Sequence, residues 1–163
     1  MQRRNFMNLF SLFGIGAATA AKTAQAASKP TRADRIQLSD AQWKARLTPA
    51  QYRVLRDEGT EAPHSSPLNA ENRTGTFHCA GCELPLFASS AKYESGTGWP
   101  SFHTPLEGAL GTSTDYKMLL PRTEYHCARC GGHQGHVFND GPRPSGKRYC
   151  NNGVALIFVA AAP

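Results

Sequence analysis

The fold of this chain is decided by two stretches of sequence, Cys79-Ala-Gly-Cys82 and Cys127-Ala-Arg-Cys130-Gly-Gly132. Two CxxC pairs can place four thiolates tetrahedrally around Zn²⁺, and a set of four leaves no open coordination position. We therefore predict one structural Zn²⁺ per chain, bound by Cys79, Cys82, Cys127 and Cys130. Two disulfides are the alternative that an oxidising compartment would favour. Paired CxxC segments around a β region fit zinc better.

Glycine and proline interrupt the sequence every few residues after Pro63. Short β-prone runs lie between these breaks, and no long helical period is present. We expect a mainly β fold of short antiparallel strands joined by ordered loops. The strands are predicted at Gly75–Cys79, Tyr116–Leu120, Glu124–His126, Gly135–Phe138 and Val154–Ala160.

Two helix starts precede the β region. Ser39 and Gln42 form one capping box, and Thr48 and Gln51 form a second one, with Pro49 at the first helical position. The pattern predicts two or three short N-terminal helices, two of them within about Asp40–Glu58.

The first residues read as an export signal. Arg3 and Arg4 are followed by an apolar run of small residues from Leu9 to Ala21 and by Ala24-Gln25-Ala26. This order is typical of a secretory signal, and the paired arginines resemble a twin-arginine signal. A membrane anchor is the alternative, but the run is too short to span a bilayer. We predict a signal at 1–26, a linker at 27–38, and a single domain at 39–163 in a periplasmic or otherwise exported protein.

The charge balance counts against one class of partner. The formal net charge of the 163-residue chain is +6, and the first 26 residues contribute Arg3, Arg4 and Lys22 without any acidic residue. The remaining excess is mild and unclustered, which does not favour nucleic acid as a partner. The mature chain is expected to have no membrane span.

Cys150 is the fifth cysteine and has no partner in the four-cysteine set. An unpaired cysteine of this kind is a buried core residue without a chemical role, half of an intermolecular disulfide, or a reactive thiol. Arg148 and Asn152 lie two residues away on either side, so a strand here would place all three on one face. A guanidinium beside a thiol favours the thiolate.

Several motifs in one order resemble the methionine-R-sulfoxide reductase family, type B. They are Thr48-Pro-Ala-Gln-Tyr-Arg-Val-Leu-Arg with Gly59-Thr-Glu, Gly98-Trp-Pro-Ser-Phe102, Arg122-Thr-Glu, Cys130-Gly-Gly-His133-Gln-Gly-His136-Val-Phe, Asp140-Gly-Pro, and Arg148-Tyr-Cys-Asn-Asn-Gly153. The likeness runs from about Asp40 to Phe158. It implies two antiparallel sheets arranged like a tent, with a four-cysteine zinc site.

The resemblance also implies a set of site residues. Cys150 would be the nucleophile that attacks the sulfoxide sulfur and becomes a sulfenic acid. His133 and His136 would donate protons, and Arg148 and Asn152 would support the site. Trp99 and Phe102 would bind the substrate, methionine-R-sulfoxide held mainly in oxidised exported proteins.

Thr97 marks a departure from the family pattern. Many members carry a second cysteine there, which attacks the sulfenic acid. With the other four thiols bound to zinc, we expect a one-cysteine cycle in which an external thiol reduces Cys150 directly.

Two other classes of function compete with a reductase. A zinc-ribbon-like binding module would leave Cys150 inert, and the weak charge and export signal count against it. A thiol redox protein would use the CxxC pairs as disulfides, but no βαβ pattern surrounds them.

Overall fold

Two antiparallel sheets and two short helices make up the computed structural model, which describes residues 33–162. The helices are α1 (Asp40–Arg46) and α2 (Pro49–Leu55), and the short 3₁₀ turns are η1 (Pro67–Ala70), η2 (Ser89–Ala91) and η3 (Gly153–Ala155). The strands are β1 (Gly75–Cys79), β2 (Pro85–Ala88), β3 (Lys92–Tyr93), β4 (Ser101–Phe102), β5 (Leu110–Asp115), β6 (Arg122–Cys127), β7 (His133–Phe138), β8 (Arg148–Asn151) and β9 (Leu156–Ala160).

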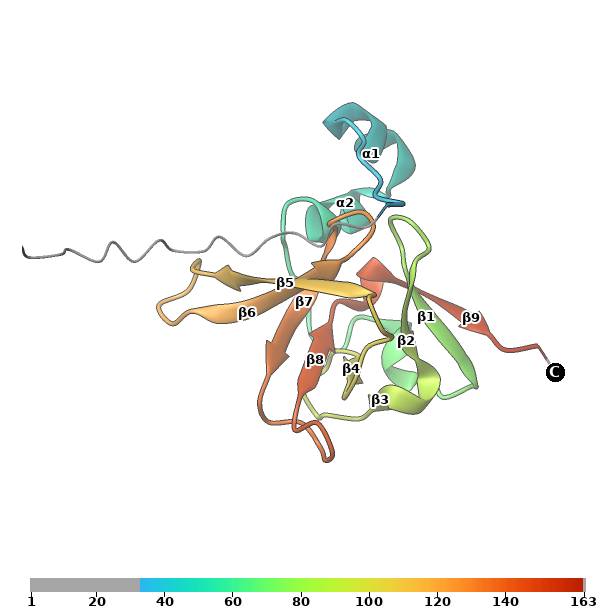
Figure 1. Cartoon of the computed structure of the whole chain (residues 1–163), viewed down its shortest axis with the longest axis vertical. Coiled ribbons are helices and arrows are strands. Elements are labelled where there is room, and N and C mark those ends of the chain that lie inside the picture. Colours follow the sequence, from blue (N-terminus) through green and yellow to red (C-terminus); the bar gives the residue numbers. More distant parts are fainter. Residues whose placement is uncertain (1–32, 163) are drawn as a thin grey trace, which may run out of the picture.

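The larger sheet has the order β3-β4-β8-β7-β6-β5, and the smaller one has the order β2-β1-β9 (Figure 1). An aromatic cluster fills the space between them: Phe77 and Phe87 of the small sheet meet Phe102 of the large sheet at ring distances of 5.0 and 4.1 Å. Burying such large apolar side chains is the main stabilising contribution to a domain of this size. The prediction of a mainly β fold with two antiparallel sheets is confirmed.

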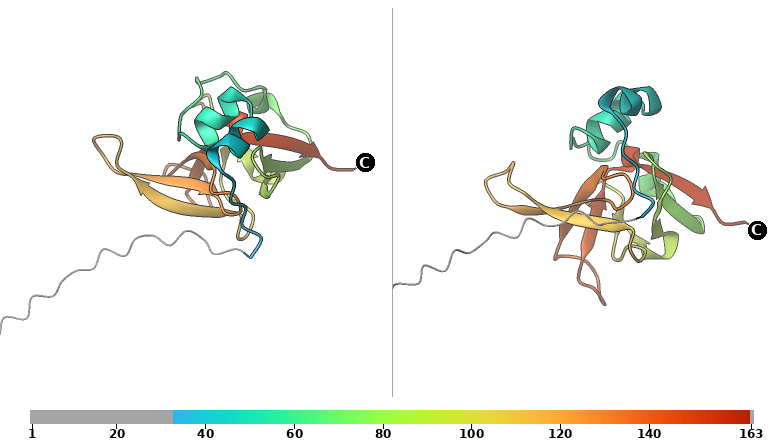
Figure 2. Two further views of the ribbon diagram at one scale, coloured as in Figure 1. Left: turned by 90° about the horizontal axis from the view of Figure 1, so that it is seen from above. Right: turned by 45° about the horizontal axis from the view of Figure 1, so that its top comes forward.

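Both predicted capping boxes form. Ser39 and Thr48 each accept a hydrogen bond from the backbone N–H three residues later, and Gln42 and Gln51 reach back to them. The helices bury Trp43, Val54 and Leu55. Helix α2 contacts η3 and β7 (Figure 2), so it braces the two elements that flank the end of β8.

The strand predicted at Tyr116–Leu120 is wrong. The strand is β5, and Asp115 pairs with Arg122, so the residues between them form the tip of a hairpin. The β-prone composition of this stretch suggested a strand, but it forms a loop in which most side chains are strongly exposed. Figures 1 and 2 show the β5–β6 hairpin projecting from the body of the molecule.

The predicted signal at 1–26 and the first part of the predicted linker lie outside the described residues. The end of the linker contacts the domain, since the Ile36 N–H donates to the Arg129 carbonyl at 2.9 Å and Asp34 accepts from Arg129 Nε at 2.8 Å. Within residues 33–162, no helix has the length and apolar character needed to span a membrane.

Candidate functional site

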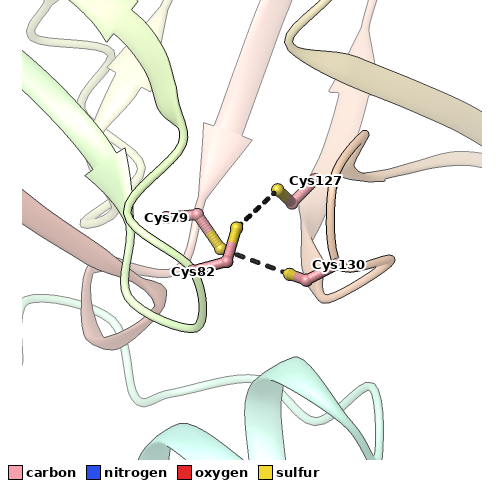
Figure 3. Close-up of side chains that lie close together, drawn as sticks. All are labelled: Cys79, Cys82, Cys127 and Cys130. Carbon is pink, nitrogen blue, oxygen red and sulfur yellow. Dashed lines mark hydrogen bonds between the residues drawn. The ribbon is translucent and has the colours of Figure 1, made fainter. Parts of the chain in front are cut away.

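The four cysteines of the CxxC pairs come together in one buried cluster (Figure 3). All four Sγ atoms lie within 4.8 Å of one another, with Cys79 and Cys130 at 3.6 Å and Cys82 and Cys127 at 3.4 Å. A disulfide would need about 2.05 Å. Four sulfurs around a tetrahedral zinc ion stand about 3.8 Å apart. The cluster is therefore close enough to bind a metal ion, and it does not have the spacing of two disulfides.

Tight turns on both sides hold the thiols in this arrangement. The Glu83 N–H donates to the Cys79 carbonyl at 2.7 Å, and the Gly131 N–H donates to the Cys127 carbonyl at 2.9 Å. Both Glu83 and Gly131 have positive φ, which is why glycine suits the second turn. The two turns are thus local copies of each other and present their sulfurs to a common centre.

Two amide groups also point at the sulfurs. The Gly132 N–H donates to Cys130 Sγ, and Gln134 Nε2 donates to Cys79 Sγ, each at 3.4 Å. Hydrogen bonds of this type orient and stabilise thiolates that bind a metal. Because one pair of cysteines belongs to the small sheet and the other to the large sheet, an ion here would join the sheets.

Cys150 lies in a different environment, in the middle of the large sheet. In the strand ladder it is paired with Ser101 of β4 on one side and with His136 of β7 on the other. Its side chain is half-buried and lines an open pocket of about 130 Å³. The other lining residues are Thr60, Trp99, Arg122, Gly135, His136, Phe138, Asn151 and Asn152.

The sequence predicts that Arg148 favours the Cys150 thiolate, but the pKa of this thiol is raised. Burial raises the pKa of the Cys150 thiol, and this outweighs the opposite effects of Arg148 and Thr97. Arg148 donates two hydrogen bonds to Asp140 at 2.9 Å, and its guanidinium lies 4.3 Å from the centre of the Phe138 ring. The positive charge is shared with that carboxylate, so Arg148 lies beside the thiol without making the thiolate the favoured form.

His136 and Arg122 both line the pocket and meet at one carboxylate. His136 Nε2 lies 2.7 Å from Asp115 Oδ2, and Arg122 Nη2 donates to the same oxygen at 2.7 Å. A hydrogen bond from the Lys117 backbone and the contacts with His136 and Arg122 hold the pKa of Asp115 well below its usual range. Burial lowers the pKa of His136 despite this carboxylate, so the imidazole is mainly neutral at pH 7.

His133 stands behind His136 and outside the pocket. Its ring centre is 5.4 Å from that of His136, and its Nδ1 lies 2.9 Å from Glu124 Oε1. Glu124 also contacts His126 and Ser113. Burial opposes the ionisation of Glu124, but these hydrogen bonds outweigh it and lower its pKa. His133 is therefore held by Glu124 and packs against His136, and it is not among the residues that line the pocket.

Glu61 fastens the other wall of the pocket. Its carboxylate accepts hydrogen bonds from the backbone N–H groups of Gly153 and Val154 at 2.6 and 2.9 Å. Its carbonyl accepts from Trp99 Nε1 at 3.2 Å, and its N–H donates to Asn152 Oδ1 at 2.9 Å. Glu61 thus holds both the Trp99 indole and the backbone of Gly153 and Val154, which follow Cys150 in the chain. The Asn152 side chain is used in holding this loop.

Phe102, which the sequence predicts to bind the substrate, does not line the pocket. It is fully buried and stacks on Phe87. Side chains alternate between the two faces of a strand. Since Ser101 pairs with Cys150 on the pocket side, the next residue must point into the core.

The structure brings Cys150, His136, Trp99 and Asn152 together at the pocket, with Arg148 directly beside them. The sequence did not predict that Arg122, Asp115 and Glu61 belong to the site. Arg122 and Glu61 stand within the motifs quoted above, which could have singled them out. Asp115 gave no signal, because its position depends on the register of β5 against β6.

Comparisons with known proteins agree with this geometry. A profile of the SelR domain matches residues 47–160. A peptide methionine sulfoxide reductase MsrB of Leptospira interrogans is 50% identical over 124 residues, which cover 76% of this chain and 95% of that protein. The chloroplastic peptide methionine sulfoxide reductase B1 of Arabidopsis thaliana is 40% identical over 147 residues, covering 90% and 73% of the two chains.

Among solved structures, a Mis18 "Yippee-like" domain matches 56% of this chain and 100% of its own, with a TM-score of 0.43 and 18% identity. Similarity this distant adds nothing about function.

Fold and site define a small β protein with a buried four-cysteine cluster that could bind a metal ion and a separate cysteine in an open pocket. The chain belongs to the methionine sulfoxide reductase B family, the peptide-methionine (R)-S-oxide reductases.

Proposed function

We propose that this protein reduces methionine-R-sulfoxide in peptides and proteins to methionine, using Cys150 as its only catalytic thiol. One observation carries the proposal. Cys150 is the single cysteine that reaches a pocket, and it does so between Trp99, His136 and Arg122. The other four thiols are buried together and face one another.

In the first half of the cycle, the Cys150 thiolate attacks the sulfur of the sulfoxide. The sulfur–oxygen bond of the substrate breaks, a sulfur–oxygen bond forms on Cys150, and one proton is taken up. The substrate sulfur is reduced by two electrons, and Cys150 is oxidised to a sulfenic acid. Negative charge develops on the sulfoxide oxygen during the attack, so a cation near that oxygen accelerates the step.

Arg122 and His136 are the pocket groups suited to that oxygen. The guanidinium of Arg122 supplies a fixed positive charge, and Asp115 holds it beside the imidazole. His136 is mainly neutral before the reaction, and Asp115 favours the protonated ring as charge appears on the oxygen. The Trp99 indole, fixed by Glu61, offers an aromatic face to the methyl group on the electron-poor sulfur.

The sulfenic acid has no cysteine beside it. Thr97 is the residue whose hydroxyl lies next to the Cys150 thiol, and the remaining cysteines belong to the metal cluster. An external thiol therefore attacks Cys150, releasing water and leaving a mixed disulfide. A second thiol breaks that disulfide and restores the Cys150 thiol.

The four-cysteine cluster fits Zn²⁺ by its donor set, its sulfur spacing and the amide groups that face Cys79 and Cys130. Zinc bound there would supply structural stability and no chemistry to the reaction. It would hold the turn between β6 and β7, and these strands carry Arg122 and His136.

The proposed setting is an exported one. Residues 1–26 would be removed as a twin-arginine-type signal, 27–38 would link it to the domain, and 39–163 would repair oxidised proteins outside the cytoplasm. Sequencing the N-terminus of the protein recovered from the exported fraction tests this. A mature chain that still begins at Met1 would contradict it.

The activity is tested with dithiothreitol and the separate R- and S-sulfoxides of dabsyl-methionine. The full chain should reduce the R form only, and Cys150→Ser should abolish turnover while keeping the thermal unfolding midpoint. Turnover that survives in Cys150→Ser would overturn the assignment of Cys150. Disulfide exchange that also survives there would point to a redox protein that uses the CxxC pairs.

A further inference from the structure

An apolar patch covers the tip of the β5–β6 hairpin. The exposed fractions of its side chains are 76% for Tyr116, 60% for Met118, 99% for Leu119 and 74% for Leu120. In the part of the chain that the structure describes, only two further large apolar residues are exposed, Ile157 and Val159 on β9. Soluble proteins seldom cluster apolar side chains on a projecting loop, and such clusters mark interaction sites.

The tip lies close along the chain to a residue of the Cys150 pocket. Arg122 is the first residue of β6 and lines the pocket, while Leu119 and Leu120 precede it by three and two residues. At about 3.3 Å per residue, the two leucines lie within roughly 10 Å of Arg122 along the chain. A polypeptide that leaves the pocket past Arg122 meets the tip next.

Contacts at the base hold the tip in place. The Lys117 side chain pairs with Glu58 after α2 at 2.7 Å, and its backbone N–H donates to Asp115 Oδ1 at 2.8 Å. Asp115 in turn pairs with Arg122. The same carboxylate therefore anchors the tip and His136, so the patch keeps a fixed place relative to the pocket.

The charges at the tip favour one kind of partner. Lys117 is matched by Glu58 and Arg122 by Asp115, so the patch has no unpaired cation among the residues that carry it. Binding to an anionic lipid surface uses clustered lysine and arginine, which this tip lacks. Uncharged, apolar contacts suit a segment of polypeptide with apolar side chains.

We infer that the hairpin tip, Tyr116 to Leu120, is the docking surface for apolar residues that flank the oxidised methionine in a protein substrate. This inference rests on the proposed function and deepens it. The pocket would take the sulfoxide side chain, and the tip would take its neighbours in an extended chain. Free methionine sulfoxide would use the pocket alone.

The test compares two substrates across two double variants of the full chain. One substrate is N-acetylmethionine-R-sulfoxide, and the other is a peptide with leucine and valine flanking methionine-R-sulfoxide. Leu119→Ser with Leu120→Ser removes the two leucines of the patch, and Ile157→Ser with Val159→Ser is the matched control on β9. Each leucine contributes through partial burial, so kcat/KM for the peptide should fall about tenfold in the tip variant, mostly through KM.

The tip variant should reduce N-acetylmethionine-R-sulfoxide as fast as the unchanged protein, and the β9 variant should match the unchanged protein on both substrates. Equal losses on both substrates would overturn the inference, because the tip would then only maintain the pocket. An unchanged rate on the peptide would overturn it as well, as would co-sedimentation with anionic vesicles that is lost in the tip variant while peptide turnover is kept. Failure of the proposed function itself would appear differently, since the unchanged protein would reduce neither substrate.

Discussion

Five cysteines occupy two environments in this protein, and the same side chain has a different role in each. Cys79 and Cys127 end strands β1 and β6, and Cys82 and Cys130 lie in the tight turns that follow. Each sulfur of one CxxC pair has a partner in the other pair at 3.4–3.6 Å. Cys150 lies within strand β8, where its partners on the adjacent strands are Ser101 and His136, and its side chain lines an open pocket. All five residues are cysteines, so only their surroundings can distinguish the structural role that we propose for four of them from the reactive role that we propose for Cys150.

We expect substitutions in the two environments to have opposite effects on stability and activity. Disturbing the cluster should change the stability of the fold first and activity only as a consequence. Disturbing the pocket should change activity while leaving the fold intact.

Removing the metal, or one of its ligands, should unfold the domain. A structural zinc site contributes about 10–16 kcal/mol of apparent binding free energy in small zinc peptides, which exceeds the usual stability of a domain of this size. Treating the protein with a strong chelator, or making Cys127→Ser, should abolish the cooperative thermal transition measured by circular dichroism. Cys150→Ser is the control and should unfold like the unchanged protein. A metal-free protein with an unchanged transition would contradict the assignment of the cluster.

Arg122→Met should lower kcat by about 10²–10³ by removing a cation of the pocket lining that we propose to stabilise the developing charge on the sulfoxide oxygen. The side chain keeps a similar length, so the hairpin should keep its fold. Arg122→Lys should recover part of the activity, since it restores the charge without the paired geometry at Asp115. Steady-state kinetics with the R-sulfoxide measures both variants, and an unchanged kcat in Arg122→Met would exclude this role.

Glu61→Gln should reduce kcat/KM about tenfold. The carboxylate holds the N–H groups of Gly153 and Val154, and charge-assisted hydrogen bonds contribute about 1.5–3 kcal/mol. Loosening them displaces Trp99, which is held by the carbonyl of the same residue, so we expect mainly a rise in KM. Glu83→Gln is a matched control on the zinc side and should leave KM unaltered. A fall in kcat alone would show that Glu61 does not position the indole.

The alkylation rate of Cys150 should depend on pH with a midpoint above that of an ordinary cysteine. Burial raises its pKa, so the thiolate is the minor form at pH 7 and grows as the pH rises through the raised value. Arg148→Gln should move the midpoint further upward, because Arg148 lowers the pKa. Iodoacetamide labelling followed by mass spectrometry measures this, and a midpoint below that of free cysteine would reverse the sign of our interpretation.

The division of the cysteines into a group of four and a single Cys150 could be predicted from the sequence, because it depends on short motifs. The CxxC spacing predicts a shared site whatever surrounds it, and the capping residues Ser39 and Thr48 act within a few positions. Cys150 stood out because it had no partner in the sequence.

What the sequence could not predict depends on strand register. Phe102 points into the core because its neighbour Ser101 is paired with Cys150, and no local pattern fixes that pairing. Asp115 reaches His136 only because β5, β6 and β7 align, which long-range contacts determine. The run at Tyr116–Leu120 was predicted as a strand from its composition. Composition alone does not show that these side chains are exposed at the tip of a hairpin.

The most direct test of a cycle that uses Cys150 alone is to treat the reduced, zinc-loaded protein with one equivalent of methionine-R-sulfoxide and to determine its intact mass and labelling pattern. We expect a gain of one oxygen atom, dimedone trapping at Cys150 only, and four cysteines that remain unlabelled until the metal is removed. An internal disulfide between Cys150 and a cysteine of the cluster, with release of zinc, would contradict it.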